Sequence, residues 1–176
     1  MEKVIILHGT GSNPNSYWHP YIKRGLENKG YVVSIPELPN TSEPNIKEML
    51  PFILENESFD ENTILIGHSS GCPLILAILE NLNVTVKQVI LVAGFCDTLP
   101  SKSLQESYKF DIIKSNCEKF VFINSINDPW GCNETQGRKM FDKLGGTLII
   151  NNEGHMGSGK YNQEYKEFPF LLKLIE

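Results

Sequence analysis

Gly67-His68-Ser69-Ser70-Gly71 lies between two apolar runs, Thr63–Ile66 before it and Pro73–Leu79 after it. This order predicts a buried strand, a Gly-x-Ser-x-Gly turn and a helix. In such a turn the central serine has a strained backbone, and its hydroxyl stands clear of the sheet at the start of the helix. Glycines flank it because a side chain there would collide with the neighbouring strand or helix. We therefore interpret Ser69 as a candidate nucleophile.

The motif has a simpler interpretation that needs no catalysis. A short Gly/Ser turn at a helix start also arises when Ser69 or Ser70 only caps the helix. Evidence for chemistry must therefore come from the rest of the chain.

Apolar segments alternate with amphipathic ones along the whole chain. The strand-like segments carry Val, Ile, Leu or Phe on both faces, as in a parallel sheet covered on both sides. We predict an α/β fold, in which residues 1–176 form a single domain with a doubly wound, mostly parallel six-stranded sheet and helices on both faces. The predicted strands are 3–7, 31–35, 63–67, 87–93, 119–124 and 146–151, and the predicted helices lie near 16–28, 45–56, 70–81, 111–116, 133–144 and 162–175.

Composition argues against several classes of partner. The chain has 176 residues and a net charge of −5, and its lysines and arginines are dispersed, which disfavours nucleic acid and anionic membranes. The N-terminus turns polar too early for a signal peptide, so we expect a cytoplasmic location. The cysteines have no paired spacing, which argues against zinc and predicts free thiols in a reducing compartment. They are Cys72, Cys96, Cys117 and Cys132.

Candidate partners for Ser69 follow two later strands. In doubly wound sheets, ligands bind beyond the carboxyl ends of the strands. Asp128 comes just after the fifth predicted strand and His155 just after the last, so the chain order is serine, aspartate, histidine. Asp97, after the fourth strand, is a rival for the acid. We favour Asp128 because its loop follows the strand expected to neighbour the last one.

A Gly-rich turn follows the first predicted strand, in His8-Gly9-Thr10-Gly11-Ser12. Acyl transfer creates an oxyanion that needs preorganised donors. We predict that the backbone amides of Thr10 and Ser70 supply them. A nucleotide-binding protein is disfavoured because the chain lacks both the G-x-G-x-x-G pattern and a phosphate-binding lysine motif.

Four segments together resemble a known family. They are His8–Gly11, Gly67–Gly71, Asn127–Pro129 and Gly154–Gly157. Their residues, order and spacing are similar to those of the small serine hydrolases of the retinoblastoma-binding protein 9 and YdeN type. The resemblance implies a compact α/β-hydrolase fold with six strands and no cap domain.

The same resemblance implies roles for three residues. Ser69 would be the nucleophile, Asp128 the acid and His155 the base. The interaction after which part of the family is named uses a Leu-x-Cys-x-Glu motif. This chain has Trp130 in place of the leucine in Trp130–Glu134, so we expect no such partner.

The expected reaction is hydrolysis of a small acyl substrate, most simply a carboxylic ester, through an acyl-enzyme intermediate. It requires no metal or organic cofactor. Trp18 and Trp130 are candidate pocket walls. Amide, peptide and thioester substrates stay open, as do a monomer and a small homo-oligomer. The alternative from another class is a binding or regulatory protein on a hydrolase scaffold, with weak or lost turnover.

Overall fold

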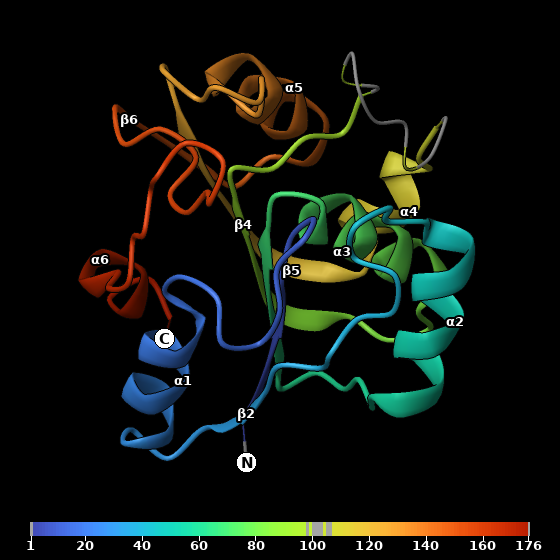
Figure 1. Ribbon diagram of the computed structural model, residues 1–176. Coiled ribbons are helices and arrows are strands. Elements are labelled where there is room, and N and C mark those ends of the chain that lie inside the picture. Colours follow the sequence, from blue (N-terminus) through green and yellow to red (C-terminus); the bar gives the residue numbers. More distant parts are fainter. Residues whose placement is uncertain (1, 98, 100–103, 105–106, 176) are drawn as a thin grey trace.

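The computed structural model describes residues 2–97, 99, 104 and 107–175. Its centre is one six-stranded sheet with strand order β2-β1-β3-β4-β5-β6, in which every pairing is parallel (Figure 1). The doubly wound parallel sheet predicted from the sequence is thereby confirmed. The strands are β1 (Lys3–Leu7), β2 (Val32–Ser34), β3 (Thr63–His68), β4 (Val86–Val92), β5 (Cys117–Ser125) and β6 (Thr147–Asn151).

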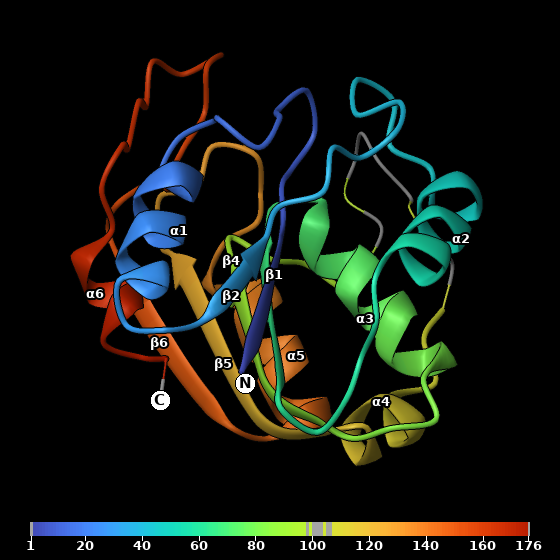
Figure 2. The same ribbon diagram turned by 90° about the horizontal axis from the view of Figure 1, so that it is seen from below.

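Helices cover both faces of this sheet because its strands are apolar on both. In β1, Val4 and Ile6 pack into one core and Ile5 and Leu7 into the other, following the two-residue period of a strand. Among the described residues, two helices lie over the first face and four over the second (Figure 2). The first pair is α1 (His19–Glu27) and α6 (Pro169–Leu172), and the second group is α2 (Ile46–Asn56), α3 (Gly71–Asn81), α4 (Phe110–Ser115) and α5 (Glu134–Leu144).

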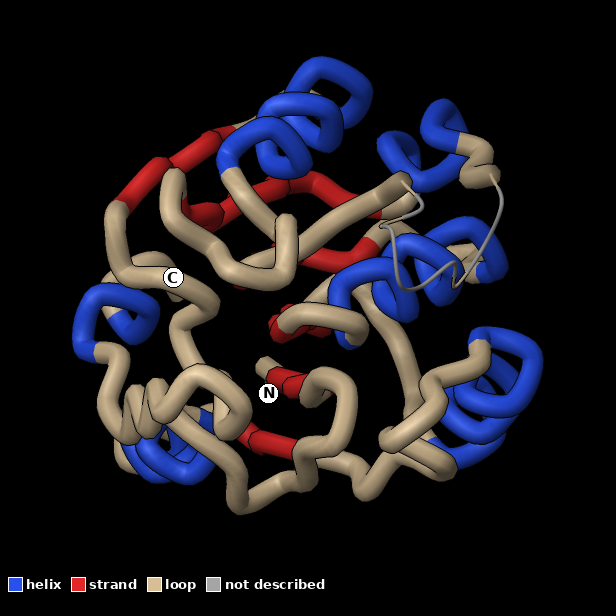
Figure 3. Tube along the Cα trace, turned by 45° about the horizontal axis from the view of Figure 1, so that its top comes forward, coloured by secondary structure: helices blue, strands red, loops and turns tan. Residues whose placement is uncertain are grey.

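The winding reverses between β1 and β3. From β1 the chain crosses to β2 at one edge, and from β3 it proceeds through β4 and β5 to β6 at the other edge. The turn after β1 and the turn after β3 therefore lie side by side at the carboxyl ends of the strands, where such folds bind ligands. Figure 3 shows loops crossing these strand ends between the surrounding helices.

Two predicted helices are shorter in the structure. The first starts at His19 rather than near residue 16, because Tyr17 has a left-handed φ of 52° and Pro20 suits a first helical turn. The last spans only Pro169–Leu172 rather than 162–175. Residues before it are diverted into an antiparallel bridge between Ser158 and Gln163.

The connection between β4 and α4 contains residues 98, 100–103 and 105–106, so the expected absence of a cap domain lies in part outside the described residues.

None of the helices in the described residues has the length and apolar character that a membrane crossing requires. All four cysteines are buried thiols.

Candidate active site

The turn after β3 holds Ser69 in a strained conformation. Its φ is 53°, a left-handed value that is costly for a residue with a side chain. The Ser69 amide donates to the Val92 carbonyl at 3.0 Å, which ties the turn to β4. A Cβ on Gly71 would lie 2.1 Å from the Leu7 carbonyl oxygen, and one on Gly9 would lie 2.9 Å from the Ser69 Cβ. Glycine at these positions lets the β1 turn and the helix approach Ser69 closely.

His155 and Asp128 meet over the end of β5. The Nδ1–H of His155 donates to Asp128 Oδ2 at 2.7 Å. The Asp128 side chain is fully buried and that of His155 is 6% exposed. The other oxygen, Oδ1, accepts from the Trp130 amide at 2.8 Å, so the Asp-Pro segment is also a turn. One carboxylate therefore shapes its own loop and orients the imidazole.

The rival acid lies elsewhere. The Asp97 carboxylate pairs with the Lys139 ammonium at the surface, and its side chain is 43% exposed. In the described part of the chain it forms no ion pair or hydrogen bond with a histidine. The geometry thus favours Asp128 as the partner of His155.

The loop that carries His155 is held from three sides. The His155 amide donates to Gln163 Oε1 at 2.8 Å, and the Gly154 amide donates to Asn127 Oδ1 at 2.9 Å. His68 lies 3.0 Å from the His155 carbonyl through its Nε2, which must carry the proton because a carbonyl can only accept. His68, the variable residue of the Gly-x-Ser-x-Gly motif, therefore holds the His155 loop in place.

Thr10 and Ser70 face one another across the reversal point of the sheet. The Thr10 hydroxyl donates to Ser70 Oγ at 3.0 Å, and both residues line the same pocket as Ser69. Within the described residues, neither backbone amide donates a hydrogen bond to another protein group. These two amides are therefore free to bind a ligand in the pocket, and their role toward an oxyanion stays a prediction.

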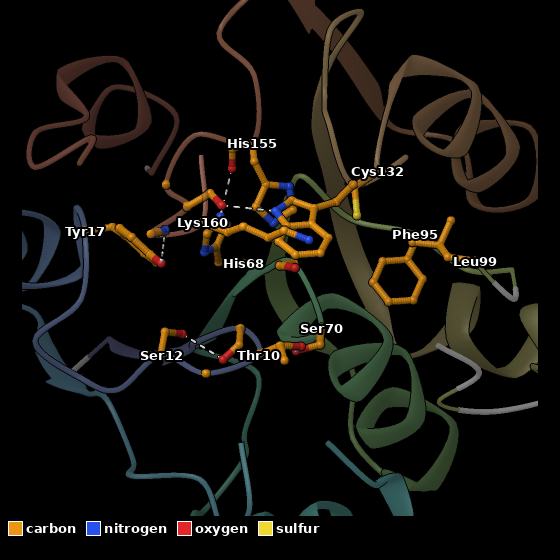
Figure 4. Close-up of a pocket in the computed structure, with 17 residues that line it drawn as sticks. Thr10, Ser12, Tyr17, His68, Ser70, Phe95, Leu99, Cys132, His155 and Lys160 are labelled. Carbon is orange, nitrogen blue, oxygen red and sulfur yellow. Dashed lines mark hydrogen bonds between the residues drawn. The ribbon is translucent and has the colours of Figure 1, made fainter. Parts of the chain in front are cut away.

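A cavity of about 230 Å³ joins these elements (Figure 4). Ser69, His155 and Trp130 all line it, as expected for Trp130. Several other lining residues were not predicted from the sequence. Those that follow β4 or the His155 loop lie beyond the carboxyl ends of strands, as His155 does, so the same pattern could have indicated them. The missed residues with side chains in the lining are Ser12, Tyr17, Phe95, Leu99, Cys132, Ser158 and Lys160.

Trp18 does not line this cavity, contrary to expectation. Its side chain is fully buried, its Nε1–H donates to the Met156 carbonyl at 2.9 Å, and its ring contacts His68 and Phe168. It precedes α1, whose apolar face packs on the sheet, so it joins the core behind the site. Trp18 therefore supports the His155 loop through Met156 and does not line the cavity.

His155 and two neighbouring side chains are also possible metal ligands. Atoms of Asp128, Cys132 and His155 lie within 4.8 Å of one another. Two ligands around tetrahedral zinc are separated by roughly 3.3 Å, given metal–ligand bonds near 2.05 Å. The 2.7 Å between His155 Nδ1 and Asp128 Oδ2 is a hydrogen-bond distance instead. An ion here would have to break that hydrogen bond.

All four histidines gather around the site. Ring centroids are 6.4 Å apart for His8 and His19, 5.8 Å for His19 and His68, and 5.2 Å for His68 and His155. Burial lowers the pKa of His19 to about 3 and, together with the nearby His155 and His19, lowers the pKa of His68 well below its usual value. Both imidazoles are therefore neutral in the folded protein.

These neutral histidines should make stability depend on pH. In the unfolded chain each binds a proton near pH 6.5, whereas His19 in the folded protein binds one only near pH 3. Unfolding therefore takes up protons below pH 6.5, and the free energy of unfolding falls with falling pH in that window. We expect His19 alone to contribute a loss of about 2 kcal/mol between pH 7.5 and 5.

Urea denaturation at a series of pH values measures this loss. The variant His19→Phe should show a shallower fall, whatever its stability at pH 7.5, because phenylalanine does not titrate. An unchanged slope in the variant would contradict the assignment of the pH dependence to this residue.

A family model described as serine hydrolase matches residues 4–175. The chain belongs to this serine hydrolase family. The resemblance to the retinoblastoma-binding protein 9 and YdeN type is thereby confirmed, and the serine hydrolase has the α/β-hydrolase fold.

Individual relatives agree with this assignment. The serine hydrolase is 33% identical to YdeN of Bacillus subtilis over 110 residues, which cover 61% of this chain and 58% of YdeN. It is 25% identical to the serine hydrolase RBBP9 of Rattus norvegicus over 92% of this chain and 90% of the rat protein. The crystal structure of the ydeN gene product superimposes with a TM-score of 0.90 at 25% identity, over 99% of this chain and 96% of that one.

Proposed function

We propose that this serine hydrolase cleaves small carboxylic esters through an acyl-enzyme formed on Ser69. The proposal rests chiefly on one arrangement. Ser69 and His155 line the same cavity, and the far side of the His155 ring donates to a buried carboxylate, that of Asp128, at 2.7 Å. A serine, a base and an acid that orients the base are the groups that acyl transfer requires.

In the proposed first step, His155 Nε2 accepts the proton of the Ser69 hydroxyl while the serine oxygen attacks the ester carbonyl carbon. Asp128 keeps the other imidazole proton on Nδ1, so that Nε2 presents its lone pair, and it stabilises the imidazolium that forms. The carbonyl oxygen becomes an oxyanion, which the amides of Thr10 and Ser70 bind. Collapse of this intermediate breaks the bond to the leaving alkoxide, which takes the proton from His155 Nε2 and departs as an alcohol.

Water completes the cycle. His155 takes a proton from a water molecule, the hydroxide oxygen attacks the acyl carbon, and the same two amides bind the second oxyanion. Breaking the bond to Ser69 returns the proton to its hydroxyl and releases the carboxylic acid. Every proton that leaves Ser69 or water is carried by His155, so no cofactor takes part in the proposed reaction.

A series of 4-nitrophenyl esters from acetate to laurate tests the substrate class. The cavity of about 230 Å³ accommodates only a short acyl chain. Methylene groups beyond that length stay in water, so they do not contribute the binding free energy of about 0.8 kcal/mol that each buried CH₂ provides. We expect kcat/KM to peak at a short ester and not to rise further toward laurate. Matched 4-nitroanilides should be cleaved more slowly. A steady rise to laurate, or faster cleavage of the anilides, would contradict the proposed preference.

A further inference from the structure

The active-site cavity has two chemically different ends. Phe95 and Leu99 lie at one end, and Figure 4 places Lys160 between Tyr17 and His155, away from them. Among the described lining residues, Lys160 is the only side chain with a permanent charge, and none of them is a carboxylate. The cavity therefore joins an apolar end to a cationic one.

The ammonium of the exposed Lys160 lies against two aromatic rings beside the cavity. Its Nζ lies 4.8 Å from the centroid of the Trp130 ring and 5.7 Å from that of Tyr161. Those rings contact each other edge to face, with centroids 5.3 Å apart. An ammonium has three N–H donors, and in the described residues none of those of Lys160 is taken by a protein acceptor. The charge is thus positioned by ring faces with donors left for a ligand.

The turn that carries Lys160 is itself well fixed. Ser158 and Gln163 exchange two backbone hydrogen bonds, of 2.9 and 2.8 Å. The Gly159 amide donates to the Tyr17 hydroxyl at 3.0 Å, and Trp130 Nε1–H donates to Ser158 Oγ at 3.1 Å. These contacts tie the turn to both walls of the cavity. A ligand that binds Lys160 therefore meets a preorganised backbone, which reduces the entropy lost on binding.

We propose that this cavity selects esters that carry a carboxylate, with the carboxylate bound by Lys160 and a small apolar group bound between Phe95 and Leu99. The inference rests on the proposed esterase activity and adds the substrate's charge to it. The protein as a whole carries a net charge of −5, so its overall field does not attract anions. A preference for an anionic ester must then come from the local ammonium.

Two pairs of esters test the proposal and locate the charge. In the first pair, 4-nitrophenyl hydrogen adipate is compared with 4-nitrophenyl hexanoate, which places the carboxylate on the acyl side. In the second, 4-acetoxybenzoate is compared with 4-acetoxybenzamide, which places it on the leaving group. Spontaneous hydrolysis is subtracted throughout. We expect kcat/KM to favour the anionic ester by roughly tenfold in one pair, mainly through KM, as for a charged hydrogen bond partly exposed to water.

Variants assign this preference to the ammonium. Lys160→Gln should bring the ratio of anionic to neutral ester close to one, and Lys160→Arg should retain most of it. Lys47→Gln removes the same charge from the exposed start of α2, outside the cavity, and should leave the ratio unchanged. Equal rates within both pairs, or a ratio that Lys160→Gln does not lower, would overturn the proposal.

A covalent readout separates this proposal from the esterase proposal. An alkyl fluorophosphonate and its carboxylate-bearing analogue should label Ser69 at different rates, and Lys160→Gln should remove the advantage of the anionic probe. Labelling that is faster for the anionic probe supports the charge preference even if no ester is cleaved. If the neutral esters are cleaved and the two probes react at equal rates, the charge preference is wrong while the esterase activity stands.

Discussion

Replacing Ser69 by alanine is expected to abolish labelling by a fluorophosphonate and to lower kcat for ester hydrolysis by about 10⁴-fold or more. Both effects have one cause, since the serine oxygen is the atom that forms the covalent bond in the proposed reaction. The fold should survive, because alanine retains the Cβ that fits the strained turn and only the hydroxyl is lost. Labelling followed by mass spectrometry and steady-state kinetics measure the two effects.

Ser115→Ala is the matched control for this variant. Ser115 lies at the exposed end of α4 and its hydroxyl donates only to the Ile112 carbonyl, at 2.8 Å. The fluorophosphonate should label the Ser115→Ala variant to the same extent as the wild type. If folded wild-type protein is not labelled, or if Ser69→Ala still is, then Ser69 is not an activated nucleophile. The first outcome would favour a binding protein on a hydrolase scaffold.

Replacing Asp128 by asparagine is expected to lower kcat by about 10³- to 10⁴-fold with little change in structure. Asparagine keeps the oxygen that accepts from the Trp130 amide at 2.8 Å, so the turn is preserved. Its amide group faces His155 Nδ1 as a donor, which forces that nitrogen to accept and moves the imidazole proton to Nε2. The base then has no lone pair for Ser69. Kinetics and near-UV circular dichroism, measured together, distinguish lost chemistry from lost folding.

Asp97→Asn is the control because Asp97 is the alternative acid in the sequence. Its carboxylate pairs with Lys139 at the surface, where an ion pair contributes at most about 1 kcal/mol. We expect its kcat to stay close to that of the wild type. A large loss in Asp97→Asn together with a small one in Asp128→Asn would reverse the assignment of the acid.

Local patterns were sufficient for most of the architecture. Buried parallel strands are continuous apolar runs, and each of the six predicted segments overlaps an observed strand. Helix boundaries were less predictable where loops compete with helices. The segment 162–175 has helix-forming residues, but Ser158 and Gln163 pair across a turn and delay the helix until Pro169. That pairing depends on residues brought together by the fold, and no local pattern encodes it.

In the candidate site, too, some residues could be predicted from the sequence and others could not. Ser69, Asp128 and His155 could be found from the sequence because each directly follows a parallel strand, and parallel strands end at one edge of the sheet. The role of Trp18 could not be predicted, since a tryptophan next to a Gly-rich turn is equally suited to a pocket or a core. Its burial against His68 and Phe168 depends on how α1 packs.

The sequence by itself determined the class of fold, the turn that carries Ser69 and the positions of the candidate acid and base after later strands, because period, glycine placement and strand ends are local properties of the chain. Only the tertiary structure decided that Asp128 rather than Asp97 meets His155, and that Lys160 folds onto Trp130 at the cavity. Both are contacts between residues that lie far apart in the sequence. Their distances depend on how the loops pack over the sheet.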